Sequence, residues 1–167
     1  IAKDPAFERT RENGSEFAHC AKMAQLFRNS VSDKVELAKD HRTSSRLNQV
    51  MHAIKALDST SARGERNVPT GIQHPDGPKQ LQGFEFNSNG QITQIFTQLQ
   101  ALDVQNGTLN HQGFIPNKHL SYPEGAQEAD LQLIAVQVDF SEGTYTMTES
   151  AKTTLAKGPD PVDLSLQ

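Results

Sequence analysis

The side chains best suited to chemistry are one thiol and six imidazoles. The single cysteine, Cys20, follows His19 and precedes Met23, and soft metal ions favour such ligands. All three fall within one helical pattern, and neither a second cysteine nor a helically spaced histidine accompanies them. A Cys–His–acid catalytic set would depend on residues brought together by folding. We therefore expect structural roles for these residues, with no metal site, no cofactor and no catalytic residue.

Motifs of known catalytic or nucleotide sites are absent from the sequence. It contains no GxSxG, no glycine-rich phosphate loop and no HExxH. The carboxylates fall mostly in turns and helix-capping positions. We expect that the protein is not an enzyme and has no small-molecule substrate. A single cysteine also excludes a disulfide scaffold, and no apolar run is long enough to predict a membrane span.

Arginine is confined to the stretch between Phe7 and Val68. Residues 1–67 have a formal charge of +3 and residues 68–167 one of −7, which gives −4 for the chain. Acidic residues are interleaved with the arginines, and this favours ion pairs within the chain. A protein interface and nucleic-acid binding stay open as alternatives. The candidate interface arginines are Arg9, Arg11, Arg42, Arg46, Arg63 and Arg66.

The first element expected to position these side chains is a helix. Asn13 and Glu16 have the spacing of a capping box, which predicts the helix start. Apolar residues then recur at steps of three and four. They are Phe17, Cys20, Ala21, Ala24, Phe27 and Val31. We expect a break between Asn29 and Asp33, where Asp33 and Glu36 offer a second capping box.

The clearest amphipathic helix comes next. One of Thr43, Ser44 or Ser45 is expected to cap it, and Asp58–Ser59–Thr60 to end it. Its apolar residues are Leu47, Val50, Met51, Ile54 and Leu57. The helices thus extend over about residues 14–60.

A connector rich in glycine and proline follows at residues 62–80. We divide the chain into a helical segment at 1–66, a connector at 67–80 and a β-sandwich-like domain at 81–167. The predicted fold class is α+β, with N-terminal helices followed by an antiparallel β-sandwich.

Strands are predicted at intervals of about ten residues, as in β-sandwiches. Residues 91–102 fit a strand or a short helix, and we favour a strand. Asn106–Gly107 indicates a tight hairpin. Residues 131–140 alternate apolar and polar side chains and are predicted to form one central strand. The other predicted strands are 83–87, 144–148, 153–156 and 162–166.

The last predicted strand bears an apolar set that is a candidate interface with a partner. It consists of Val162, Leu164 and Leu166. A separate candidate is Ser59. Asp58–Ser59–Thr60 resembles the short O-glycosylation acceptor of exported Bacteroidetes proteins, with Ser59 as the modified residue.

Several motifs together resemble a family of uncharacterised Bacteroidetes proteins with no assigned activity. They are FERTRENGSEF, KD-x-R-x-x-SRL at 39–47, DSTSARGERNV and GFEFN. The resemblance covers residues 1–87 well and the later part loosely. The chain departs from the family at His19, Cys20 and Met23, where family members have small residues.

Members of this family are longer at both ends, which implies that the β-sheet is incomplete in this chain. The chain begins at Ile1 rather than at Met, and we expect a processed or truncated product. Our leading hypothesis is a non-catalytic structural subunit of a filament or similar assembly, secreted or at the cell surface. Copies of the chain would join by strand addition at an open sheet edge. The alternative is a nucleic-acid-binding module that uses the arginine-rich helices.

Overall fold

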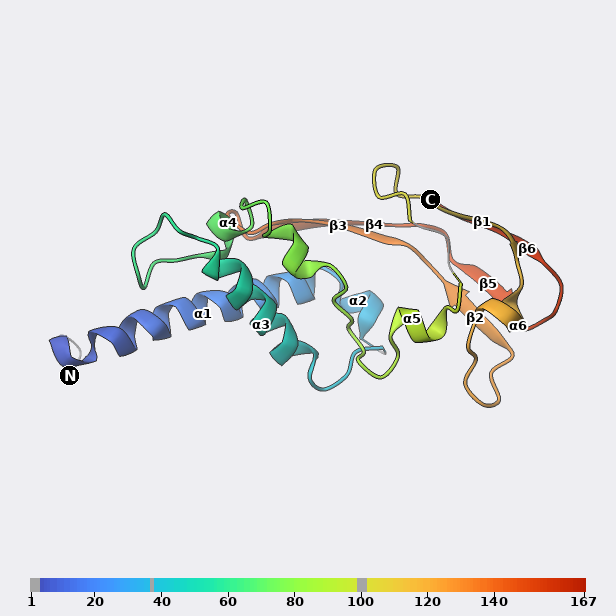
Figure 1. The fold of residues 1–167 in the computed structure, drawn as a ribbon, viewed down its shortest axis with the longest axis horizontal. Coiled ribbons are helices and arrows are strands. Elements are labelled where there is room, and N and C mark those ends of the chain that lie inside the picture. Colours follow the sequence, from blue (N-terminus) through green and yellow to red (C-terminus); the bar gives the residue numbers. More distant parts are fainter. Residues whose placement is uncertain (1–3, 37, 99–101) are drawn as a thin grey trace. The chain divides into compact units, whose positions relative to one another are not determined.

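The computed structural model describes residues 4–36, 38–98 and 102–167. Helices occupy the first part of the chain and antiparallel strands the last part, so the α+β prediction is confirmed (Figure 1). In chain order the elements are η1 (Pro5–Phe7), α1 (Glu8–Asn29), α2 (Ser32–Val35), α3 (Thr43–Ala56), α4 (Val68–Gly71), η2 (Pro78–Leu81), α5 (Ile92–Ile95), β1 (Leu109–Phe114), α6 (Pro116–His119), β2 (Glu128–Leu131), β3 (Ile134–Asp139), β4 (Thr144–Glu149), β5 (Thr153–Ala156) and β6 (Val162–Leu166).

These elements form two compact units. The first runs from the N-terminal helices to Asn87 and also takes in Gln137–Thr146. The second comprises Ser88–Val136 and Met147–Gln167. The predicted connector therefore belongs to the helical unit, where it forms α4 and η2.

The start of α1 differs from the prediction. The helix begins at Glu8, so Asn13 and Glu16 lie inside it and do not form a capping box. The chain turns helical earlier because Pro5 occupies the first position of η1 and the Asp4 carboxylate accepts a hydrogen bond from the backbone of Ala6 at 2.9 Å.

The predicted break after α1 is confirmed, but the predicted caps are wrong. Asp33 lies within α2 and does not cap it. Thr43 is the first residue of α3, and Asp40 supplies the polar contact at the helix start by accepting from the Arg42 N–H at 2.8 Å. The Thr43 hydroxyl donates instead to the carbonyl of Phe86 at 2.6 Å.

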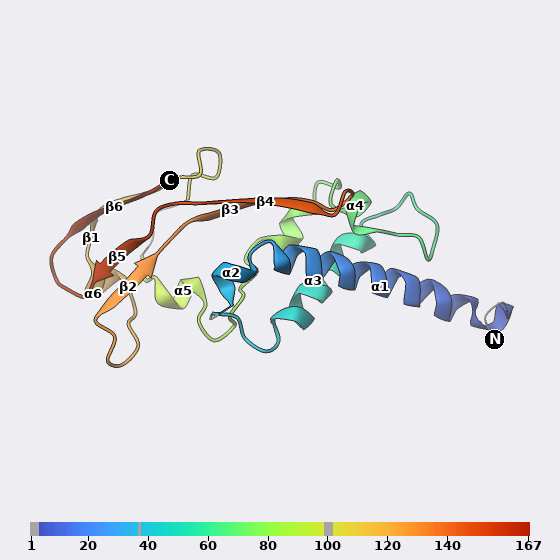
Figure 2. The same cartoon turned by 180° about the vertical axis from the view of Figure 1, so that it is seen from behind.

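The core of the first unit lies where α1 crosses α3, as seen from two sides in Figures 1 and 2. Phe17, predicted on the buried face of α1, is exposed. Its ring packs against that of His52, with 5.4 Å between the ring centres. Ala21 is exposed as well. The buried cluster contains Cys20, Met23, Ala24, Leu47, Met51, Ile54, Val68 and Phe140.

Gly71, at the end of α4, allows the connector to pack onto α3. A Cβ atom at this position would lie 2.0 Å from the carbonyl oxygen of Ile54. No side chain fits at that distance, so glycine is required here. The neighbouring Val68 is fully buried against the same helix.

The second unit contains two antiparallel strand pairs. In one, β1 pairs with β6, with Leu109 opposite Leu166. In the other, β2 pairs with β5, with Glu128 opposite Ala156. The apolar cluster between them contains Leu109, Phe114, Leu120, Leu155, Leu164 and Leu166.

Three strand predictions differ from the structure. Residues 83–87 contain no strand. Within 91–102, the described residues form helix α5 and a single bridge from Phe96 to Leu120, while 99–101 lie outside the described residues. The predicted strand 131–140 is divided, because β2 ends at Leu131 and β3 begins at Ile134. The chain changes partner there, from β5 to β4.

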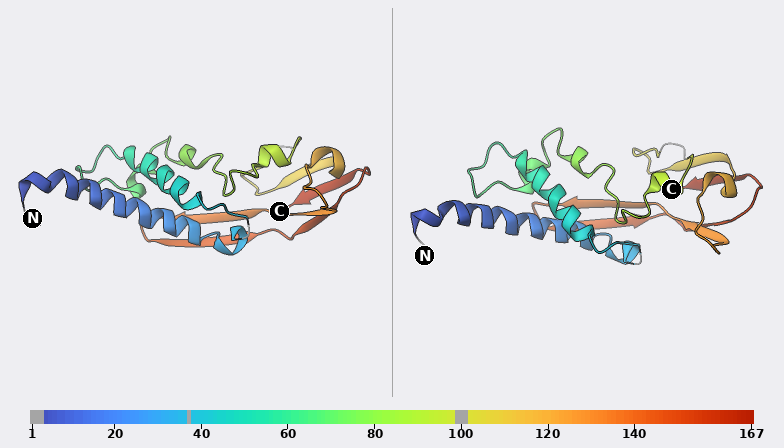
Figure 3. Two further views of the ribbon diagram at one scale, coloured as in Figure 1. Left: turned by 90° about the horizontal axis from the view of Figure 1, so that it is seen from below. Right: turned by 60° about the horizontal axis from the view of Figure 1, so that its bottom comes forward.

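The remaining strand predictions are confirmed. Asp103 and Thr108 bridge across the hairpin turn at Asn106–Gly107. The predicted strands 144–148, 153–156 and 162–166 correspond to β4, β5 and β6. Figure 3 shows β3 and β4 running side by side as one hairpin.

Candidate assembly surface and paired arginines

Glu16 joins three segments of the first unit through one buried carboxylate. Its side chain comes from α1, and the residue is 3% exposed. Lys55 of α3 donates to Oε2 at 2.6 Å. From the loop after α3, the Arg66 guanidinium donates through Nε to Oε1 at 2.8 Å and through Nη2 to Oε2 at 2.9 Å. The backbone N–H of Gly64 donates to Oε1 at 2.9 Å.

These donors keep Glu16 ionised. The Arg66 hydrogen bonds, together with those from Lys55 and Gly64, lower the pKa of Glu16 to about 2 despite its burial. A buried carboxylate with this many donors is a structural link between helices. It does not act as a proton donor or acceptor near neutral pH.

Asp58 organises the same loop from inside. The residue is 2% exposed, and its carboxylate accepts hydrogen bonds from the backbone N–H groups of Thr60 at 3.1 Å, Ser61 at 3.0 Å and Asn67 at 3.0 Å. Burial opposes ionisation, but the hydrogen bonds from Ser61, Asn67 and Thr60 outweigh it and hold the pKa of Asp58 well below its usual range. Ser59, the candidate glycosylation residue, is exposed beside this buried carboxylate.

The predicted pairing of arginines with interleaved acids is confirmed for four of the six candidates. Besides Arg66, Arg9 and Arg63 both reach Glu12, at 3.3 and 3.0 Å. Arg46 contacts Asp40 at 2.7 Å. Arginines held in this way have less charge available for phosphates.

Arg46 also ties the residues after η2 to the start of α3. Its Nη2 donates to the carbonyl of Glu85 at 2.7 Å, and its guanidinium lies 5.8 Å from the ring centre of Phe84.

The two remaining candidates are Arg11 and Arg42. Arg11 donates to the carbonyl of Asp4 at 2.9 Å. Arg42 is exposed, and its backbone N–H donates to the Asp40 carboxylate at 2.8 Å.

The residues that could have supplied soft-metal chemistry have structural contacts. His19 accepts a hydrogen bond through Nε2 from the backbone of Val68 at 2.9 Å. Cys20 is fully buried, and burial raises the pKa of its thiol to about 11, so the thiol stays protonated. Within residues 4–36, 38–98 and 102–167, no three His, Cys, Asp or Glu side chains form a group that could hold a metal ion.

The apolar set of β6 divides between core and surface. Leu164 and Leu166 are 2% and 3% exposed and pack in the core of the second unit, whereas Val162 is 37% exposed. The first two side chains are therefore not on the surface. Of this set, a partner can reach only Val162.

The strongest candidate for a binding surface is one that the predicted site residues did not include. In the described residues, each strand from β1 to β6 pairs with one other strand, so each has an edge without a strand neighbour. All six residues of β4 are exposed, including Tyr145 at 45% and Met147 at 37%. The signal in the sequence was the run TYTMT, which has no charge and high β-propensity.

A hollow in the second unit offers little for specific recognition of a small molecule. It has a volume of about 430 Å³ and lies between Ile95 and Tyr122. The Tyr122 hydroxyl is already engaged with the carbonyl of Leu155 at 3.3 Å. Glu128 is the charged residue among its lining residues.

The chain matches no protein-family model, no curated protein and no solved structure. Among the described residues, no helix combines the length and the apolar character needed to cross a membrane.

Proposed function

We propose that this chain is a non-catalytic structural subunit of a self-assembling filament or similar assembly. Copies of the chain join by adding strands to one another's sheets. The observation that supports this most is that the described strands form three separate two-stranded sheets. Pairs of strands are marginal in isolation, and their unpaired main-chain groups are templates for a further strand.

Strand addition would also extend the sheets toward the β-sandwich that the strand spacing predicts. The second unit already has an apolar cluster between two strand pairs. Strands from neighbouring copies would turn each of these two-stranded sheets into a sheet of three or more strands. We place the assembly outside the cell or at its surface, in line with the resemblance to Bacteroidetes proteins.

Negative-stain electron microscopy and light scattering test this proposal together. Purified chain, imaged across a range of concentrations and at moderate salt, is expected to form ordered particles or filaments. Light scattering gives their mass in the same samples. Particles of monomer size under every condition contradict the proposal.

A further inference from the structure

The free edge of β4 has a defined set of main-chain groups. Ser150 donates its N–H to the carbonyl of Leu133, on the β3 side of the hairpin, at 3.0 Å. Main-chain groups alternate in direction along a strand. Thr146, four residues before Ser150, therefore points its N–H and C=O toward β3. Those of Tyr145 and Met147 point to the open side.

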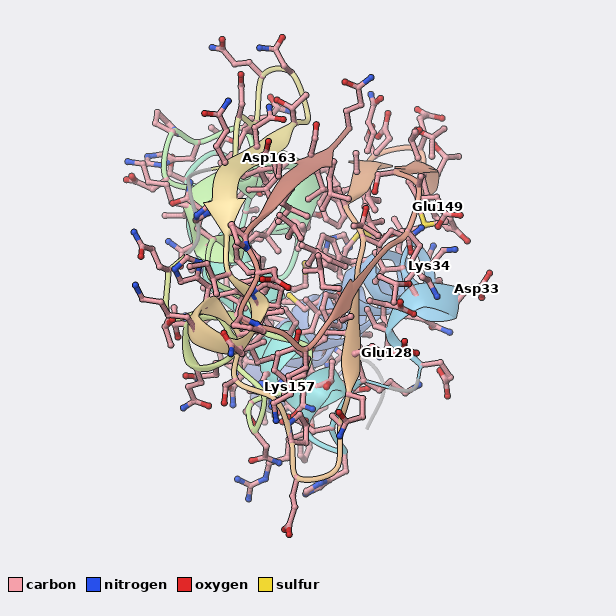
Figure 4. The ribbon with its side chains drawn as sticks, turned by 90° about the vertical axis from the view of Figure 1, so that its right-hand side faces the viewer. Asp33, Lys34, Glu128, Glu149, Lys157 and Asp163 are labelled. Atoms are coloured by element: carbon pink, nitrogen blue, oxygen red, sulfur yellow. The ribbon has the colours of Figure 1, made fainter. Side chains whose placement is uncertain are left out.

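This edge lacks the features that protect strand edges from other chains. Such features are lysine, proline, inward charges and bulges. From Thr144 to Thr148 the strand is uncharged, and the acidic Glu149 comes only at its end (Figure 4). Its side chains are exposed throughout.

The strands of the other two pairs have such features. Glu128 and Lys157 place charge at the β2–β5 pair (Figure 4). In β1 the register shifts after His111, and Pro161 immediately precedes β6. β3 differs from β4 in that its Val138 side chain packs against the core of the first unit.

We propose that β4 pairs with β4 of a second copy, antiparallel and about a two-fold axis at Thr146. This inference rests on the proposed function and names the edge and the partner. The pairing joins two hairpins into a four-stranded sheet in the order β3–β4–β4–β3. The two-fold axis makes the contact isologous, since each copy contributes the same residues; it joins two copies, and a filament uses a second edge as well.

Side-chain chemistry selects this partner and this register. With Thr146 opposite its counterpart, Tyr145 faces Met147 of the second copy, and an aromatic ring with a thioether is a favourable pair. Thr144 faces Thr148 on the other side of the sheet. No two like charges meet. A shift that centres the axis on Met147 places Tyr145 opposite Glu149 and loses this match.

The register predicts a specific cross-link. Because the main-chain groups of Thr146 point to β3, the two Thr146 residues form a non-hydrogen-bonded pair, with Cα atoms about 4.5 Å apart. That separation lies within the range of disulfides. Thr146→Cys should therefore give a covalent dimer on mild oxidation. Met147→Cys and Thr148→Cys are the matched controls, since neither residue faces itself in this register.

Wild-type chain under the same oxidation is the background control, because its own thiol, Cys20, is fully buried. We expect a dimer band on non-reducing gels for Thr146→Cys at least ten times stronger than for either control. Equal bands for all three variants overturn the register. A strong band for Met147→Cys alone moves the axis by one residue and overturns it as well.

Introducing a charge at position 146 gives a second readout that needs no cross-link. Thr146→Lys places two ammonium groups opposite each other and should weaken self-association at least tenfold, whereas Thr148→Lys, which faces Thr144, should weaken it far less. An equimolar mixture of Thr146→Lys and Thr146→Glu should associate again. Circular dichroism confirms that each variant is folded.

The outcomes separate this inference from the proposed function. Wild-type chain that never associates contradicts both. The β4 pairing is overturned if the wild-type chain associates, the Thr146→Lys variant associates equally well, and the Thr146→Cys variant forms no disulfide-linked dimer. Strand addition at another edge then remains.

Discussion

The guanidinium of Arg66 and the carboxylate of Glu16 form a two-point hydrogen-bonded pair, 50 residues apart in the chain. Lys55 completes the site from α3 at 2.6 Å. The pair holds the loop after α3 against α1, so one carboxylate fixes the relative positions of both helices and the loop. These three charged side chains of the arginine-rich stretch therefore stabilise the fold.

Replacing Glu16 should expose this dependence. Glu16→Gln leaves Lys55 and Arg66 in a buried site without a counter-charge, which should cost about 3 kcal/mol of unfolding free energy. Urea denaturation followed by circular dichroism measures it. Glu12→Gln is the control, since Glu12 pairs with the more exposed Arg9 and Arg63 and should cost less than about 1 kcal/mol. Equal losses of unfolding free energy in the two variants would show that the buried Glu16 site stabilises the fold no more than the exposed Glu12 pairs do.

Acid should destabilise the first unit. Glu16 has a folded-state pKa of about 2 against an ordinary 4.5, and the pKa of Asp58 is lowered as well. The stabilisation from each carboxylate is complete above its ordinary pKa and is lost as pH falls through the folded-state pKa. The melting temperature should thus drop steadily between about pH 5 and pH 2. A melting temperature constant over that window would contradict the lowered values.

Replacing either of two glycines in the first unit with alanine should change the stability, in opposite directions at the two positions. Gly71→Ala forces a Cβ against the Ile54 carbonyl and should cost more than about 2 kcal/mol, as backbone must move. Gly14→Ala in α1 meets no atom within 4 Å and should stabilise by up to about 1 kcal/mol. Thermal melts of both variants test this, and a neutral Gly71→Ala would show that α4 does not pack as described.

The stability of the loop after α3 should depend on the side chain of Asp58 and not on that of Ser59. Asp58→Ala leaves the backbone N–H groups of Thr60, Ser61 and Asn67 without their acceptor and should cost about 2 kcal/mol. The exposed Ser59→Ala should change stability by less than about 0.5 kcal/mol. Hydrogen exchange of those three amides is the sharper readout, because Asp58→Ala should expose them selectively.

Local sequence patterns predicted the helices and turns that depend on nearby residues. The spacing from Leu47 to Ile54 sufficed for α3, and Asn106–Gly107 sufficed for its hairpin. The capping box at Asn13 and Glu16 failed because the helix already begins at Glu8, and the Glu16 carboxylate is engaged by Arg66, 50 residues away. The local residues Asp4 and Pro5 could have indicated the early start, but no local pattern indicates the contact with Arg66.

The sheet shows the same limit. The alternation over 131–140 indicated strand correctly, but the change of partner between Leu131 and Ile134 depends on where β4 and β5 lie. Likewise, the apolar residues of β6 fitted an interface or a core equally well. Only the pairing with β1 places Leu164 and Leu166 inside.

Sedimentation velocity of the wild-type chain over a wide concentration range tests self-assembly most directly. Self-assembly predicts species heavier than the 18.4 kDa monomer, with an average mass that rises with concentration. A single species of 18.4 kDa at every concentration would contradict it.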